Sequence, residues 1–109
     1  MSVDFTTMIG YGYIIDWDMV KHITDKNDEA WDNIFGTDEY SDREQTTYFF
    51  GVDMKTLYCG DYTNIKPFIE GDRLAQAALD FIVLIKELDL IDEFTLGDPP
   101  SIYIINRVS

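Results

Sequence analysis

The chain has 109 residues, of which 46% are hydrophobic and 15% aromatic, which is enough apolar surface for one folded domain over residues 1–109. It carries 21 aspartates and glutamates against eight lysines and arginines, so its net charge at neutral pH is −13. This charge repels phosphates and anionic lipid, which argues against direct binding to nucleic acid or to a membrane surface and favours a basic protein as partner.

The sequence shows no targeting signal or membrane-spanning segment. Residues 1–5 lack the basic stretch of a secretory signal, and the longest uninterrupted apolar run, residues 81–85, is far shorter than the ~20 residues that cross a bilayer. Cys59 is the only cysteine, so no intrachain disulfide can form. We expect a cytoplasmic protein.

The N-terminal part predicts a strand followed by short helical stretches. Residues 5–15 are rich in β-branched and aromatic side chains, and the two glycines at positions 10 and 12 indicate a bulge or the close approach of another backbone. Aspartates flank Trp17, which recurs with Val20 and Ile23 at helical spacing. A further helical turn through Trp31 is expected to end at Gly36, followed by a polar loop over residues 37–46.

The second half predicts three more strands and one long helix. Residues 47–52 and 56–62 are predicted to form a hairpin around a turn at residues 53–55, and residues 101–108 a last strand. Between them, residues 72–88 have a clear helical period, with Asp72 as the expected N-cap. The stripe that should face the core consists of Leu74, Ala77, Ala78, Phe81, Ile85 and Leu88.

The predicted order is strand, helix, strand, strand, helix, strand. This order predicts an α+β fold with a four-stranded, mainly antiparallel sheet and two helical segments packed on one face. The arrangement is that of a ferredoxin-like split βαβ unit.

The charge is distributed unevenly along the chain. Residues 16–44 contain ten acids and three bases, residues 70–98 contain eight acids and two bases, and the remainder is neutral. If both helical segments cover the same face of the sheet, one side of the molecule carries nearly all of the negative charge.

A strongly negative face has two readings. Surplus carboxylates can simply keep a protein dispersed, or they can imitate the phosphates of nucleic acid and occupy a cationic groove. In size and acidity the chain resembles phage-encoded inhibitors of restriction or CRISPR enzymes, a resemblance of composition alone. We therefore expect a non-enzymatic inhibitor or adaptor that binds a basic, nucleic-acid-handling protein. The predicted binding residues are Asp28, Glu29, Asp32, Asp38, Glu39, Asp42 and Glu44.

The long helix suggests an alternative. Leu79, Val83 and Leu90 lie opposite its core stripe on a helical wheel, so the helix is apolar around most of its circumference. Such a helix is either deeply buried or part of an interface. The alternative function is a homodimeric structural or regulatory protein whose acidity serves solubility.

Catalytic and metal-binding patterns are weak. His22 is the only histidine, no motif places it beside Cys59, and the acids after Asp25 fail the EF-hand pattern because Ala30 and Gly36 stand where Gly and Glu are needed. The tyrosines of the predicted strands could stack RNA bases, but the electrostatics oppose it, so packing in the core or at a protein contact is preferred. We expect no cofactor, no metal and no enzyme activity.

Overall fold

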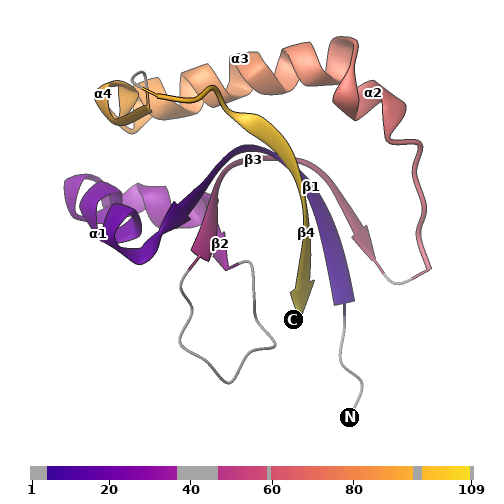
Figure 1. Cartoon of the computed structure of the whole chain (residues 1–109), viewed down its shortest axis with the longest axis horizontal. Coiled ribbons are helices and arrows are strands. Elements are labelled where there is room, and N and C mark those ends of the chain that lie inside the picture. The colour runs from indigo at the N-terminus through magenta and orange to yellow at the C-terminus, as the bar shows by residue number, and fades with distance from the viewer. Residues whose placement is uncertain (1–4, 37–46, 59, 95–96, 109) are drawn as a thin grey trace.

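The computed structural model describes residues 5–36, 47–58, 60–94 and 97–108 (Figure 1). In chain order the elements are β1 (Phe5–Asp16), α1 (Trp17–Lys26), the 3₁₀ helix η1 (Asp28–Asn33), β2 (Ile34–Gly36), β3 (Thr47–Tyr58), α2 (Lys66–Ile69), α3 (Asp72–Glu87), α4 (Ile91–Phe94) and β4 (Ser101–Val108).

The strands form one antiparallel sheet in the order β2-β3-β1-β4. Because β1 and β2 both pair antiparallel with β3, they run parallel to each other with β3 between them, and α1 and η1 connect them. The predicted α+β class with a four-stranded antiparallel sheet is therefore confirmed. The ferredoxin-like name for this order stays a prediction.

Two of the predicted strands are assigned wrongly. Residues 47–58 form the single strand β3, and the turn expected at residues 53–55 is a bulge within it, where the partners of Ile9 and Gly10 are Lys55 and Asp53 and Met54 is the extra residue. A bulge interrupts the alternation of apolar residues much as a turn does. The remaining outer strand is β2, which the sequence placed in a helical turn.

The sheet is strongly curved (Figure 1). Gly10, Gly12 and Gly51 lie where other atoms approach the backbone closely. Gly12 pairs with Gly51 across β1 and β3, and a Cβ atom at Gly12 would lie 2.1 Å from the carbonyl oxygen of Phe50. The ring of Phe49 covers Gly10, where an added Cβ would meet the ring at 2.5 Å. The bulge and the close backbone approach predicted for Gly10 and Gly12 are both present.

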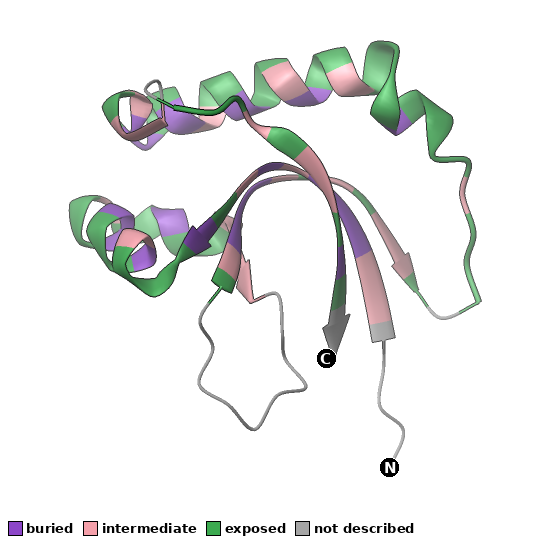
Figure 2. Ribbon diagram, in the orientation of Figure 1, coloured by how far each residue is buried: buried purple, intermediate pink, exposed green. Residues whose placement is uncertain are grey.

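Helices α1 and α3 cover the same face of the sheet, as expected, and enclose the main core (Figure 2). From the sheet, Ile15 and Phe50 enter this core beside Val20 and Ile23 of α1. Its remaining buried members come from η1, from α3 and from the turn after α3: Ala30, Phe81, Ile85, Leu88 and Leu90. A smaller buried cluster consists of Met8, Phe49 and Ile105. These side chains alternate along the strands with those of the main core, so they lie on the other face of the sheet.

Helix α3 begins and ends abruptly. Gly71, with a φ of +96°, precedes it, and Asp72 is its first helical residue rather than the predicted N-cap. The chain leaves the helix after Leu88 through Asp89, whose φ is +57°. No helix in the described part of the chain is long and apolar enough to cross a membrane.

Candidate protein-binding surface

Carboxylates are concentrated at one end of the molecule, around α1, η1, the last turn of α3, and α4 (Figure 1). Over the described residues this acidic end carries ten carboxylates and three lysines, a net charge of −7, and the other described residues carry a net charge of only −2. The carboxylates belong to Asp16, Asp18, Asp25, Asp28, Glu29, Asp32, Glu87, Asp89, Asp92 and Glu93. Among the described residues the charge is thus concentrated toward one end of the fold, rather than over the whole helical face that was predicted.

Glu93 holds the two halves of the acidic end together. Lys26 Nζ donates to its Oε1 at 3.1 Å, and His22 Nε2 contacts the same oxygen at 3.3 Å. Asn27 adds a bond from its side-chain amide to the carbonyl of Leu88 at 3.4 Å. The hydrogen bond from Lys26 lowers the pKa of Glu93 and, reciprocally, the hydrogen bond to Glu93 raises the pKa of Lys26.

Two tryptophans lie among these carboxylates with nearly half of their surface exposed. Trp17 is 43% and Trp31 45% exposed, their ring centroids are 6.3 Å apart, and Trp17 also packs against Tyr48 at 5.7 Å. The sequence placed both in predicted helical turns, and in the structure Val20 and Ala30 fill the core. The available signal was local, since an aspartate flanks each tryptophan.

Three of the seven predicted binding residues belong to the described part of the chain. Asp28, Glu29 and Asp32 lie on η1 and are all exposed. Asn27 caps this helix by accepting from the Glu29 amide at 3.0 Å, which fixes the start of the acidic turn. The other predicted binding residues, Asp38, Glu39, Asp42 and Glu44, lie outside the described residues.

The predicted oligomer interface is divided. Leu79 and Val83 are 59% and 52% exposed on the outer side of α3, whereas Leu90 is fully buried. Leu90 follows the turn at Asp89, and its amide donates to the carbonyl of Ile85 at 2.7 Å. The helical wheel failed for Leu90 because the helix ends before it, and the reversed chain directs this side chain into the core.

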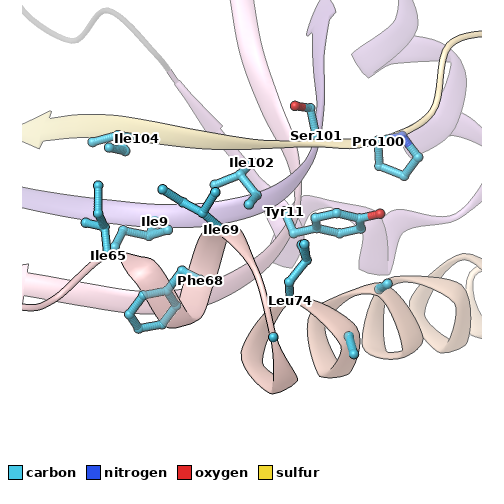
Figure 3. Close-up of a pocket in the computed structure, with 13 residues that line it drawn as sticks. Ile9, Tyr11, Ile65, Phe68, Ile69, Leu74, Pro100, Ser101, Ile102 and Ile104 are labelled. Atoms are coloured by element: carbon cyan, nitrogen blue, oxygen red, sulfur yellow. The ribbon is translucent and has the colours of Figure 1, made fainter.

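An apolar groove lies between α2, the first half of α3, and the sheet (Figure 3). Its volume is about 810 Å³. Strands β1 and β4 contribute Ile9, Tyr11, Ile102 and Ile104, and the helices contribute Phe68 and Leu74 among others. This groove was not predicted from the sequence, although Ile65, Phe68 and Ile69 recur at helical spacing before Gly71.

The remaining candidates from the sequence are His22, Cys59 and the strand tyrosines. His22 is exposed and paired with Glu93, and Cys59 lies outside the described residues. Among the described residues, no group of three or more His, Cys, Asp or Glu side chains could hold a metal ion. Tyr11 and Tyr13 pack against Phe81, and the Tyr13 hydroxyl donates to the carbonyl of Asp98 at 2.9 Å.

No protein-family model, curated protein or solved structure gave a significant match to the chain.

Proposed function

We propose that this protein is a non-enzymatic binding module that docks its acidic end into the basic groove of a nucleic-acid-handling protein, as a nucleic-acid mimic or inhibitor of the phage type. The observation that carries the proposal is the gathering of exposed carboxylates around the half-exposed pair Trp17 and Trp31. Asp28, Glu29 and Asp32 are the acidic residues nearest in sequence to Trp31.

The combination of charge and aromatic surface suits a cationic groove. Carboxylates can replace phosphates as acceptors for arginine and lysine, and complementary charge speeds the encounter and selects the partner. Tryptophan supplies apolar contact area at low entropic cost, and its ring face attracts a guanidinium or ammonium group. Trp31 and the acids of η1 therefore form the expected centre of the contact.

The surface is also held in place before binding. The contacts of Glu93 with Lys26 and His22 join α4 to α1, and Asn27 joins the start of η1 to the end of α3. A surface ordered in advance loses less conformational entropy on association. This rigidity favours a docking surface over carboxylates that serve solubility alone.

The test measures competition with DNA on purified restriction and CRISPR-type nucleases that hold a fluorescent duplex or guide complex. The protein should displace the labelled nucleic acid from its target, and direct binding should weaken about tenfold or more as NaCl rises from about 50 to 200 mM. The triple variant Asp28→Asn, Glu29→Gln, Asp32→Asn should bind at least about tenfold more weakly.

A matched triple variant separates location from net charge. Asp53→Asn, Glu70→Gln and Asp72→Asn remove the same charge from exposed residues outside the acidic end, and should change the dissociation constant by about twofold or less. Equal losses in the two triple variants, or binding that ignores salt, would overturn the proposal. So would a failure to compete with nucleic acid on any nuclease of the panel.

A further inference from the structure

We propose that the apolar groove and the neighbouring edge strand β4 form the surface through which two copies of this chain pair. The surface lies apart from the acidic end, and the inference goes beyond the proposed function. The pairing joins β4 of one copy antiparallel to β4 of the other, so that the helices beside each groove come together over a continuous sheet.

The groove and its rim are apolar and open. The residues that line it include no charged side chain, and the side-chain polar atoms among them are the hydroxyls of Tyr11 and Ser101. At the rim, Ile104 is 62%, Ile69 52% and Ile65 47% exposed (Figure 3). Large apolar side chains gathered in this way are uncommon on a monomer and mark surfaces that another molecule covers.

The outer side of α3 continues the same surface. Ala75 and Ala78 line the groove, and Ile82 follows Ala78 one turn further along the helix. Ile82 is 45% exposed and lies next to Leu79 and Val83 on the helix surface. The apolar area therefore extends from the groove along α3 and includes the two predicted interface residues that are exposed.

Strand β4 supplies an edge for pairing. Within the described residues it pairs with β1 alone, so it is an edge strand of the described sheet. Its sequence, residues 101–108, contains no proline and no acid, and Arg107 is its one charged residue. Proline, one of the features that natural proteins use to block edge-to-edge pairing, is absent from this strand.

The absence of charged residues from the groove lining suits a second copy as the occupant. Two chains of charge −13 repel each other wherever their acidic ends meet, so self-association needs a surface of low charge. Helices α1 and α4 lie toward one end of the 41 Å long axis and α2 toward the other (Figure 1). Pairing along β4 joins surfaces whose groove-lining residues carry no charge. A basic partner would be drawn to the acidic end instead.

The geometry of a two-fold pair is self-consistent. In a two-fold antiparallel pairing centred at Ile104, this residue faces its own copy on the groove side of the sheet, because directly opposite residues share a face. Ile9, the partner of Ile104 in β1, is already buried on that face. The same patch on both copies forms the interface, as a closed dimer requires.

The experiment is sedimentation equilibrium of the full chain over micromolar to millimolar concentrations at low and high NaCl. We expect a monomer–dimer equilibrium that becomes several-fold tighter between about 0.05 and 0.5 M NaCl, because salt screens the repulsion. Ile104→Asp should weaken the dimer by about tenfold or more. Tyr58→Asp adds the same charge at a strand residue of matched exposure, 65% against 62%, and should leave the equilibrium unchanged.

Hydrogen exchange locates the contact, since amides of β4 should become protected as the dimer forms. A monomer at every concentration and salt level would overturn the inference, as would a dimer that survives Ile104→Asp or a monomer that carries an apolar small molecule in the groove. The salt response of the dimer is opposite in sign to that of the proposed basic complex. The two proposals can therefore fail independently.

Discussion

Glu93 shows how a single carboxylate organises a charge-rich end of the molecule. Its side chain is 13% exposed, and both of its side-chain partners, Lys26 and His22, come from α1, which is distant in sequence. Most neighbouring carboxylates are exposed, whereas this one links two elements. The ionised carboxylate of Glu93 holds α4 against α1.

The variant Glu93→Gln tests this role through pH. Because the folded-state pKa of Glu93 is lowered, its ionised form stabilises the fold above the unfolded pKa of about 4.3, and this contribution is lost as pH falls through the folded-state pKa. We expect the variant to lose about 1 kcal/mol of unfolding free energy at pH 7. Urea unfolding measured from neutral to acidic pH should show that this difference shrinks in acid.

Glu87→Gln is the control, since Glu87 is exposed at the end of α3. Its stability should follow the wild-type curve closely at every pH. Wild type and Glu93→Gln curves that stay parallel down to strongly acidic pH would show that the ion pair does not support the fold.

Helix α3 is the element with two unlike apolar sides. Phe81 projects inward and contacts the rings of Tyr11, Tyr13, Phe50 and Phe94, with centroid separations between 5.7 and 6.3 Å. Leu79, two residues earlier, is mostly exposed. The core of the domain depends on the inner side, while the outer side remains available for association.

Alanine substitutions on the two sides should differ sharply. Phe81→Ala leaves a cavity among four aromatic rings and should lower the unfolding free energy by about 3–5 kcal/mol. Leu79→Ala should change it by about 0.5 kcal/mol or less at low protein concentration, because the side chain is exposed. Denaturant unfolding followed by circular dichroism compares them, and equal losses would contradict the assignment of the inner and outer sides.

The sequence predicted those elements whose signal is local and repeated. Helix α3, strand β1 and strand β4 follow from periodicity and composition, and the positions of Gly10 and Gly12 indicated the bulge and close approach. Strand β2 has three residues, and its pairing with β3 depends on contacts across the sheet, so no local pattern reveals it. The acids of η1 were named as binding residues from the sequence. The exposure of Trp17 and Trp31 was not predicted, because it depends on which neighbours fill the core.

At the scale of the whole molecule, charge and apolar surface are separated. The acidic end gathers most of the charge of the described residues, and the groove with the β4 edge lies beside α2, away from it (Figure 1). Such a division allows one surface to meet a basic partner while another meets its own copy. It also means that repulsion within the acidic end opposes folding.

The melting temperature should therefore rise with salt even without a partner. Screening of the carboxylates at the acidic end lowers their mutual repulsion in the folded state, and an increase from about 20 to 200 mM NaCl should add about 1 kcal/mol of stability, or roughly 4–8 °C. Thermal unfolding at low micromolar concentration, followed by circular dichroism, keeps the chain monomeric during the measurement.

The two triple variants designed above locate the source of this response. Removing charge at Asp28, Glu29 and Asp32 should reduce the salt-dependent rise in melting temperature, because these residues belong to the acidic end with its net charge of −7. Removing charge at Asp53, Glu70 and Asp72 should reduce the rise less. Addition of sucrose, which stabilises proteins without screening charge, should raise all three melting temperatures equally. A salt response that is the same in both variants would mean that the repulsion is spread over the whole surface, and the acidic end would lose its distinction as a site.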